Sequence, residues 1–358
     1  MLSKIFRAVG AVPFLLVAAW SFQTMDLDKI AATATPFALA KTIEWDGGKV
    51  SIIDFHGVPF LDDLWRGGTA TFSVSSFGYD SIAAWQVFTF LVDLGPIYAI
   101  WILESTRGAN QWSPAYLPTL FSLAAQVLGI GSVAPIFYFL CIVFGPSASS
   151  LAASPPQRRT VWHQSNLLLI PIVLLLHTSE IFGMFLPHSY DARHYWTWAW
   201  QLSPMWIGLA NIILGQAVGL LRVSFSPAVA SKLMLGILAL VSAAVWIYTV
   251  TFSPHSLPTL FLPEVGPQDG LILHSRKALQ ADEVAAYVST FLWLIYAFAD
   301  LYLAGLVGTA WLVYAALLPL VTLAVGPGAT YVLGWYIRES ILSSSKPKGS
   351  SPKQRSFR

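Results

Sequence analysis

Long apolar runs separated by short polar segments dominate this chain. A helix needs about 20 mainly apolar residues to span roughly 30 Å of hydrocarbon. The pattern therefore predicts an all-α, polytopic integral membrane helical bundle with about eight transmembrane helices, or seven if the first run is a cleaved signal peptide. The runs lie near residues 5–22, 81–103, 116–144, 165–187, 197–221, 230–252, 284–305 and 309–337.

Isolated carboxyl groups interrupt three of these runs near their middle. Asp93 lies in AAWQVFTFLVDLGPIYAIW, Glu180 in LLLIPIVLLLHTSEIFGMF and Asp300 in VSTFLWLIYAFADLYLAGLVG. A charged side chain at the centre of a bilayer costs about 3 kcal/mol on insertion scales, so such residues face a cavity, a partner or a proton-transfer task. These three carboxyl groups are therefore the first candidates for function.

The polar segments divide the chain into four predicted parts. These are a signal anchor or first transmembrane helix (1–22), a lumenal or external segment (23–80), the transmembrane domain (81–338) and a basic, disordered cytosolic tail (339–358). The external segment has eight acidic and four basic residues, and the positive-inside tendency places the basic tail in the cytosol. Arg158 and Arg159 fall in a loop predicted on the lumenal side, against that tendency.

Two further patterns concern the external segment and the apolar runs. KVSIIDF (49–55) and ATFSVSSF (70–77) alternate like strands around glycine-rich turns and predict a small hairpin or cap over the bundle. No internal repeat is evident, because the interruptions LGPIYAI, LGIGSVAP and AVGPGATYV do not recur at a fixed period. Many transporters contain repeats with paired broken helices, so this pattern lowers the case for transport.

Composition strengthens the membrane assignment. The chain is 56% hydrophobic and 11% charged, with a mean hydropathy of +0.63 and a net charge of +2. We expect membrane lipids and a lipophilic small molecule from the bilayer as partners, and no nucleic acid, because basic and aromatic residues form no patch outside the tail. A single cysteine, Cys141, leaves no intrachain disulfide framework.

The candidate catalytic residues form two pairs and a single residue. Asp93 and Glu104 are eleven residues apart, three helical turns along nearly one face, although Glu104 could instead pair with Arg107. His177 and Glu180 share a face three residues apart and could hold a proton or simply form a packing hydrogen bond. One HxxE pattern is a weak metal signal, so no metal is predicted. The set is Asp93, Glu104, His177, Glu180 and Asp300.

Aromatic residues make up 14% of the chain. They are typical of belts at the membrane interface, or they line a cavity in which each desolvated ring stabilises a cation by about 1–2 kcal/mol. Burial also favours the neutral form of a carboxyl group, so a general acid can persist in such a cavity. The candidate substrate-binding residues are Trp85, Tyr98, Trp101, Trp198 and Trp200.

Motifs for other chemistries are absent from the sequence. There is no DDxxD or NDxxD motif for a magnesium-bound diphosphate, and no P-loop, GxGxxG, GxSxG or HExxH. Chemistry that starts by ionising a diphosphate is therefore not expected, and no cofactor is predicted.

Two segments resemble a known family. The run from Tyr98 to Asn110 (YAIWILESTRGAN), followed by Pro114 and by QVLGIGSVAPIFY (126–138), is similar to fungal integral-membrane terpene cyclases, in particular the ascofuranone and ascochlorin meroterpenoid cyclases. The resemblance covers most of the membrane domain. It implies that an acid protonates the terminal epoxide of a farnesyl-type chain on an aromatic polyketide, and that the resulting cation closes rings.

We therefore expect a metal-independent terpene cyclase of fungal secondary metabolism, of isomerase type, in the endoplasmic reticulum membrane. Two alternatives remain at this stage. One is a proton-coupled transporter or exporter of a lipophilic metabolite, in which the same carboxyl groups relay protons. The other is a receptor or scaffold without catalytic activity.

Overall fold

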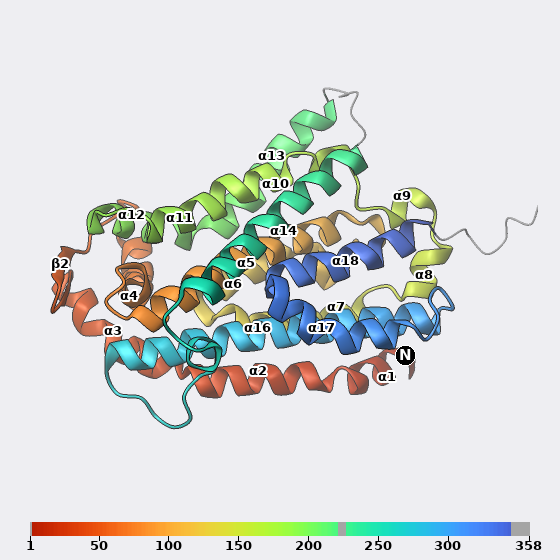
Figure 1. Ribbon diagram of the computed structural model, residues 1–358. Helices are drawn as coiled ribbons and strands as arrows, with labels where there is room; N and C mark the ends of the chain where they lie inside the picture. Colours follow the sequence, from red (N-terminus) through yellow and green to blue (C-terminus); the bar gives the residue numbers. More distant parts are fainter. Residues whose placement is uncertain (1, 221–226, 345–358) are drawn as a thin grey trace, which may run out of the picture.

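A computed structural model describes residues 2–220 and 227–344. The fold is helical apart from one small hairpin (Figure 1). The strands are β1 (Thr42–Trp45) and β2 (Gly48–Ser51). The helices are α1 (Leu2–Gly10), α2 (Val12–Met25), α3 (Leu27–Ala40), α4 (Pro59–Ser76), α5 (Ser81–Thr106), α6 (Pro118–Leu128), α7 (Ile130–Phe144), α8 (Ala148–Ala153), α9 (Pro156–Arg159), α10 (Leu169–Val173), α11 (Ser179–Phe185), α12 (Tyr190–Gln201), α13 (Ser203–Leu220), α14 (Pro227–Phe252), α15 (Leu257–Phe261), α16 (Gly270–Leu303), α17 (Trp311–Val325) and α18 (Pro327–Ser344).

Fewer helices are long and apolar enough to cross a membrane than the sequence pattern predicts. Within the described residues there are four such helices, or up to six if each of two bent pairs is one span, so the prediction of eight spans is not confirmed. The four are Ser81–Thr106, Ser203–Leu220, Ala228–Phe252 and Gly270–Leu303, and the bent pairs are Lys4–Gly10 with Val12–Ala40 and Pro156–Asn166 with Leu169–Phe185.

Two of the predicted spans are helical hairpins instead. The run 116–144 folds into α6 and α7 around Gly129, so that Phe121 and Phe137, each eight residues from that glycine, place their ring centroids 4.9 Å apart. The run 309–337 folds into α17 and α18 around Gly326, and the two helices diverge from one turn in Figure 1. Both glycines have positive φ angles, 78° and 85°, which only glycine adopts readily.

The long helix α16 begins well before the predicted position. It starts at Gly270, whereas the apolar run predicts a helix from residue 284. Its first half carries the carboxyl groups of Asp282 and Glu283, both buried. Because these adjacent acids lower the local hydropathy, the pattern excluded them from the span, although small alanine residues around them allow close helix packing.

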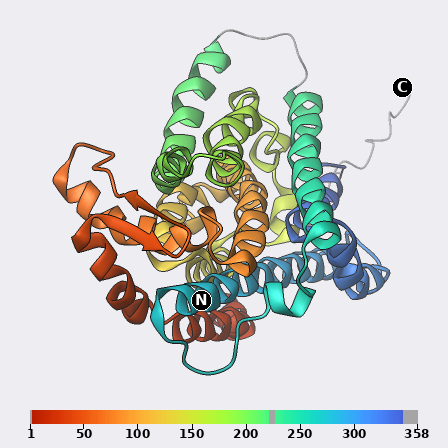
Figure 2. The same ribbon diagram turned by 60° about the vertical axis from the view of Figure 1, so that its left-hand side comes forward.

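A cap covers one end of the bundle. It consists of α3, the β1–β2 hairpin, α4 and α12, at the left of Figure 1, and Figure 2 shows the hairpin in orange from another side. The strands pair antiparallel, with Ile43 opposite Val50. The predicted strand at 70–77 is wrong, because residues 70–76 belong to α4, where Thr71 and Ser73 donate hydrogen bonds to preceding backbone carbonyls.

Within the cap, His194 of α12 binds the segment that follows β2. Its Nε2 accepts hydrogen bonds from the backbone N–H of Ile53 (3.3 Å) and from Trp198 Nε1 (3.1 Å), so the neutral ring carries its proton on Nδ1. The ring is 2% exposed. Burial lowers the pKa of His194 to about 4, so this histidine is neutral at physiological pH.

The two ends of the bundle differ in charge. The cap end carries carboxylates such as Asp54 and Asp80, paired with Arg66 and Arg276. The loop with Arg158 and Arg159 lies at the opposite end, in α9 beside α8 (Figure 1). Because the run 116–144 is a hairpin and not one span, it returns the chain to the end that it left, which is why the loop with Arg158 and Arg159 lies opposite the cap. Of the predicted tail, residues 339–344 continue α18 and residues 345–358 lie outside the described range.

Candidate functional site

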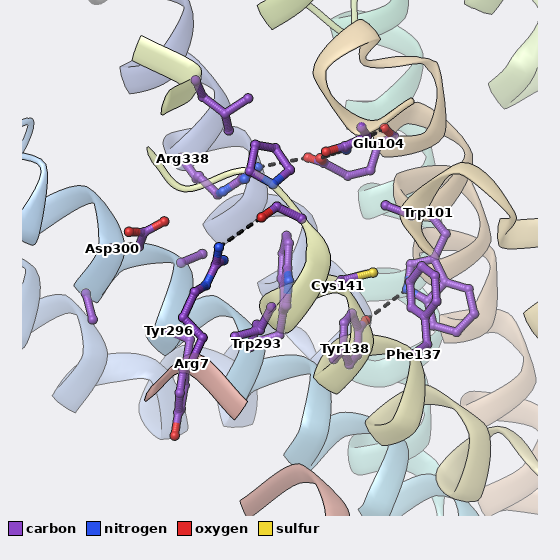
Figure 3. A pocket seen from close by; sticks show the side chains of 18 of the residues that line it. Arg7, Trp101, Glu104, Phe137, Tyr138, Cys141, Trp293, Tyr296, Asp300 and Arg338 are labelled. Carbon is purple, nitrogen blue, oxygen red and sulfur yellow. Dashed lines mark hydrogen bonds and ion pairs between the residues drawn. The ribbon is translucent and has the colours of Figure 1, made fainter. Parts of the chain in front are cut away.

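One cavity lies at the end of the bundle away from the cap, and we call it the principal cavity because carboxyl groups and aromatic rings meet in it. A larger hollow, of about 650 Å³, lies beside α6 and α13. The principal cavity has a volume of about 370 Å³ and is enclosed by α1, α5, α7, α8, α16 and α18 (Figure 3). Ligand sites commonly measure about 300–1,000 Å³, mostly apolar with a few polar groups. Three sequence-predicted residues line this cavity: Trp101, Glu104 and Asp300.

Aromatic rings form most of the cavity wall. Trp101 lies against Phe137 (ring centroids 4.2 Å apart) and donates a hydrogen bond from Nε1 to the Tyr138 hydroxyl at 3.0 Å. Tyr138 stacks on Trp293 at 5.6 Å, and Tyr331 meets Trp293 edge-on at 6.1 Å. Their hydrogen-bond partners fix the rings of Trp101 and Tyr138, so this wall is rigid before any ligand arrives.

Glu104 is the acceptor of an extensive buried network. Arg107 donates to both of its oxygens, and Arg338 donates to Oε1 at 2.8 Å. The Trp335 indole and Asn110 amide also donate to this carboxylate. Two guanidinium groups thus donate charge-assisted hydrogen bonds to Glu104. Arg107 pairs in addition with Glu339 at 2.6 Å.

Asp300 has a different environment in the same cavity. It is half-buried, and its Oδ2 accepts a hydrogen bond from the backbone N–H of Ala148 at 2.6 Å. Its Oδ1 has no protein partner among the described residues. Figure 3 shows Asp300 and Glu104 on different sides of the cavity, with Arg338 between them and with Arg7 and Tyr296 below. The cavity therefore contains one carboxylate held by two guanidinium groups and one carboxyl group without an ion pair among the described residues.

A second cavity of about 260 Å³ lies under the cap, between α3, α4, α5, α6 and α16. Tyr98 and Trp200 line it, as does Asp282. Asp282 accepts a hydrogen bond from the backbone N–H of Gly131 at 2.5 Å. Trp101 lines the principal cavity and Tyr98 lines this second one. Because these residues are one helical turn apart on α5, a single layer of core side chains separates the two cavities.

Asp93 lines neither cavity. It is fully buried, and its Oδ2 accepts a hydrogen bond from the backbone N–H of Gly328 at 3.2 Å, while Ser242 donates to its Oδ1. Asp93 and Glu104 therefore follow one helix face as predicted, but only Glu104 reaches the principal cavity. The carboxyl group of Asp93 meets the first turn of α18.

The remaining sequence-predicted residues lie elsewhere. His177 Nε2 lies 2.8 Å from the carbonyl oxygen of Leu91, in a π-helical turn (Leu174–Thr178) before α11. Glu180 is buried, with Oε2 unpaired among the described residues. Trp85 contacts Tyr248, and Trp198 belongs to the cap. Neither the histidine nor Glu180 lines one of the two cavities.

Several important polar residues are absent from the sequence-based set. Arg338 and Glu339 come from the end of α18, and Asp282 and Glu283 from the early part of α16. A signal for the second pair exists, since two adjacent acids stand among alanines in LQADEVAAYV. Arg338 carries no such signal, because its place over the Trp293 ring (5.2 Å) depends on the return of α18 from the hairpin.

Comparison with known proteins identifies the family. The model of the CtvD domain matches residues 42–268, more than half of the chain. The chain belongs to the CtvD domain family. The matched CtvD domain includes Asp93, Glu104, His177 and Glu180, whereas Asp300 and Arg338 lie beyond it.

Curated relatives of this CtvD protein are fungal. It is 27% identical to the FAD-dependent monooxygenase verC1 of Penicillium polonicum, over 97% of this chain and 44% of the relative. It is 28% identical to the FAD-dependent monooxygenase anuJ of Penicillium roqueforti, over 83% of this chain and 36% of the relative. A third, BOA8 of Botryotinia fuckeliana, is 27% identical over 69% of this chain and 33% of the relative. The chain thus spans less than half the length of these relatives.

These matches confirm the resemblance to a fungal meroterpenoid cyclase family stated from the sequence, although the relatives are named as monooxygenases. No solved structure matches this chain.

Proposed function

We propose that this CtvD protein is an integral membrane terpene cyclase of the endoplasmic reticulum. In this proposal it protonates the terminal epoxide of a farnesyl-type chain on an aromatic substrate and cyclises that chain. One observation carries the proposal. The principal cavity combines a carboxyl group without an ion pair, Asp300, with the aromatic faces of Trp101, Tyr138 and Trp293.

The first step is proton transfer from Asp300 to the epoxide oxygen. The C–O bond to the more substituted carbon breaks as the oxygen becomes a hydroxyl group, and the cation is attacked by the nearest double bond of the chain. Each further closure moves the positive charge along the chain. The final cation loses a proton to a base or is captured by an internal hydroxyl group, so the product is an isomer of the substrate and Asp300 must regain its proton before the next turnover.

The aromatic wall is suited to the cationic stage. Rings that face a desolvated cation each stabilise it by about 1–2 kcal/mol, and the faces of Trp101, Tyr138 and Trp293 surround the same space. Because the rings are held by packing and by the bond from Trp101 to Tyr138, they direct the folding of the chain before protonation. A preorganised environment of this kind lowers the barrier without reorganisation during the reaction.

Charged side chains at the cavity edge would bind the oxygenated end of the substrate. Arg338 and Arg7 both line the cavity, and Arg338 is oriented by Glu104. Guanidinium groups donate hydrogen bonds in a fixed plane and suit carbonyl or phenolate oxygens. We assign Glu104 to this orienting role and to balancing positive charge in the cavity, with Asp300 as the acid.

The names of the relatives agree with an oxygenated substrate. Three of them are described as FAD-dependent monooxygenases, a class of enzyme that inserts one oxygen atom, and epoxides are among the products of that chemistry. A partner reaction of this class would supply the epoxide that this chain opens.

The test is to give membranes containing the protein an epoxyfarnesyl-aryl substrate and to analyse the products by mass spectrometry. We expect a product of unchanged mass, formed by the wild type and lost in Asp300→Asn. The matched control is Asp46→Asn, since Asp46 is an exposed acid of the cap. No isomer from the wild type, or equal conversion by Asp300→Asn, would contradict the proposal.

Cys141 provides a second measurement. It is the sole cysteine of the sequence and lines the principal cavity. A substrate that occupies this cavity should slow the labelling of Cys141 by a small methanethiosulfonate reagent. An unchanged labelling rate at a saturating substrate concentration would place binding elsewhere.

A proton-coupled transporter is the second candidate, and the two helical hairpins favour it. Transporters often place their sites where short, interrupted helices meet, and this chain has such hairpins and a cavity on either side of the Tyr98–Trp101 turn. In that case liposomes containing the protein would show substrate-dependent proton flux, and Asp93→Asn would abolish it. Isomer formation without flux would decide for the cyclase.

A further inference from the structure

The two helical hairpins belong to two sets of helices with the same order. In the first set, α2 runs toward the cap end, α5 returns, and the hairpin α6–α7 follows. In the second set, α14 runs toward the cap end, α16 returns, and the hairpin α17–α18 follows. The insertions differ, since α3, the β1–β2 hairpin and α4 lie between α2 and α5, whereas α15 lies between α14 and α16.

The tips of the two hairpins have the same glycine pattern. The first tip reads Gly129-Ile-Gly131 and the second Gly326-Pro-Gly328. The first glycine of each has a positive φ and an extended ψ, 78° and 139° at Gly129, and 85° and 162° at Gly326. The second glycine of each leaves no room for a Cβ. At Gly131 the nearest atoms belong to the backbone of Asp282, and at Gly328 they are the hydroxyl oxygen of Ser242 and the carboxyl group of Asp93.

Each of the two aspartates belongs to one set of helices and binds the hairpin of the other set. Asp282 of α16 accepts the N–H of Gly131, and Asp93 of α5 accepts the N–H of Gly328. Asp93 lies twelve residues after the start of α5 at Ser81, and Asp282 lies twelve residues after the start of α16 at Gly270. Each long helix therefore binds the hairpin of the other set at the same position along its length.

The packing around the tips repeats as well. Helix α2 packs against α7 and α16, and α14 packs against α18 and α5. A serine from each outer helix reaches its tip: Ser21 of α2 contacts Ser132, and Ser242 of α14 donates to Asp93. A tyrosine follows each aspartate by five residues, Tyr98 on α5 and Tyr287 on α16.

We propose that residues 12–144 and 227–344 contain two copies of one structural unit, and that Asp93 and Asp282 are positioning residues, each holding the hairpin of the other unit against the principal cavity.

The second helix of each hairpin, α7 or α18, forms part of the wall of the principal cavity. Helix α7 carries Phe137, Tyr138 and Cys141, and α18 carries Tyr331 and Arg338, all of them cavity residues. The bond at Gly131 fixes the start of α7, and the bond at Gly328 fixes the start of α18. The principal cavity therefore lies between the two units, and its two walls keep their register through the two aspartates.

The two units carry different side chains at the equivalent positions that line the cavity. Eleven residues after each aspartate stands Glu104 in the first unit and Trp293 in the second, and both line the cavity. Equivalent positions thus place a carboxylate on one wall and an aromatic face on the other. A cation between them meets two different kinds of stabilisation.

The experiment compares Asp→Asn with Asp→Ala at both positions, in membranes containing the full chain. An asparagine oxygen still accepts the glycine N–H, so Asp93→Asn and Asp282→Asn should keep kcat/KM within about threefold of the wild type. Alanine leaves the buried N–H without an acceptor, so Asp93→Ala and Asp282→Ala should lower kcat/KM by at least about tenfold. Asparagine variants as inactive as the alanine variants would overturn the proposal, because the proton itself would then be required.

Thiol labelling tests the cross-connection without a substrate. Cys141 lies on α7, so Asp282→Ala should change its labelling rate by at least about threefold, whereas Asp93→Ala, which acts on α18, should change it less. Equal changes in both variants, or none in Asp282→Ala, would overturn the assignment of each aspartate to its hairpin.

Glycine-to-alanine variants test the same contacts from the hairpin side, because they add a Cβ at each tip. Gly131→Ala and Gly328→Ala should behave like the corresponding aspartate-to-alanine variants, and each double variant should lose less than the sum of its two single losses. Gly236→Ala has open space around its Cβ and should behave like the wild type. Additive double variants would contradict the coupling.

The kinetic part of this test rests on the proposed function, and the labelling part does not. If the wild type converts no substrate, the cyclase proposal fails while the labelling pattern still decides the roles of Asp93 and Asp282. If conversion is normal but the asparagine and alanine variants do not differ, the positioning proposal fails alone.

Discussion

The carboxyl groups of this bundle fall into two regions with different surroundings. At the hairpin tips, Asp93 and Asp282 are 0% and 6% exposed, and each accepts a glycine N–H at the start of a helix. At the cavity, Glu104 is held by two guanidinium groups, and Asp300 has one oxygen without a protein partner among the described residues. The position of a carboxyl group within an apolar run therefore does not show whether it holds the structure together or takes part in the reaction. Its hydrogen-bond and ion-pair partners do.

Helix starts inside the bundle explain the first region. The first N–H groups of a helix have no acceptor within the helix, and inside a membrane no water replaces it. Because α7 and α18 begin at hairpin tips within the bundle, an aspartate from a neighbouring helix supplies the acceptor.

The largest expected effect concerns Asp300. A general acid contributes about 10²- to 10⁴-fold to a rate, so Asp300→Asn should lower kcat at least about 100-fold with a smaller change in KM. Asp282→Asn, on the same helix, is the matched control and should stay near the wild type. Product formation measured by mass spectrometry checks both, and equal losses would remove the distinction between the two regions.

The second prediction concerns stability. Glu104→Gln removes the charge that Arg107 and Arg338 share, and breaking a buried ion pair costs about 3–5 kcal/mol. Asp93→Asn should cost much less, because Asp93 forms no ion pair within the described residues. Denaturation of the purified protein in detergent measures both variants. A larger loss of unfolding free energy in Asp93→Asn than in Glu104→Gln would contradict this prediction.

A third prediction extends the comparison to the cap, where the titrating group is a base. The pKa of His194 is about 4 in the folded protein and 6.5 for an ordinary histidine, so the unfolded chain binds more protons between these values. The stability from neutral His194 is complete above about pH 6.5 and is lost as the pH falls toward 4. Between pH 7 and pH 5 the loss should be about 2 kcal/mol.

Limited proteolysis of the cap at the two pH values measures this loss. His194→Leu should remove most of the pH dependence between pH 7 and pH 5, because no imidazole remains to be protonated. Cleavage of residues 41–58 that accelerates equally in the wild type and in this variant would assign the effect to another group.

The smallest effect is expected from the aromatic wall. Trp293→Leu should lower kcat/KM about tenfold, the loss of one cation–π contact of about 1–2 kcal/mol. Trp85→Leu is the control, since Trp85 contacts Tyr248 outside the principal cavity. An equal effect of the two substitutions would show that tryptophan packing, rather than the cavity face, matters.

Part of the site was accessible from sequence. Trp101, Glu104 and Asp300 were predicted and do line one cavity, because mid-run acids and tryptophans are costly or conspicuous in apolar helices. Arg338 was not predicted, because its place opposite Glu104 depends on α18 returning toward the end of α5. His177 and Glu180 were predicted as a pair from helical spacing, but His177 lies in a π-helical turn with its Nε2 against the carbonyl oxygen of Leu91, and Glu180 Oε2 has no partner among the described residues.

The sequence by itself determined that the chain is helical, with apolar runs long enough to span a membrane and with acids inside those runs, since apolar runs and their interruptions are read directly from the order of the residues. The tertiary structure decided that two of the runs are hairpins rather than spans. A positive φ at Gly129 and at Gly326 reverses the chain, and the apolar pattern is the same whether a run crosses the membrane or turns back. It also decided which acids meet: Asp282 with Gly131 and Asp93 with Gly328 are more than 150 residues apart in sequence, and only packing brings them together.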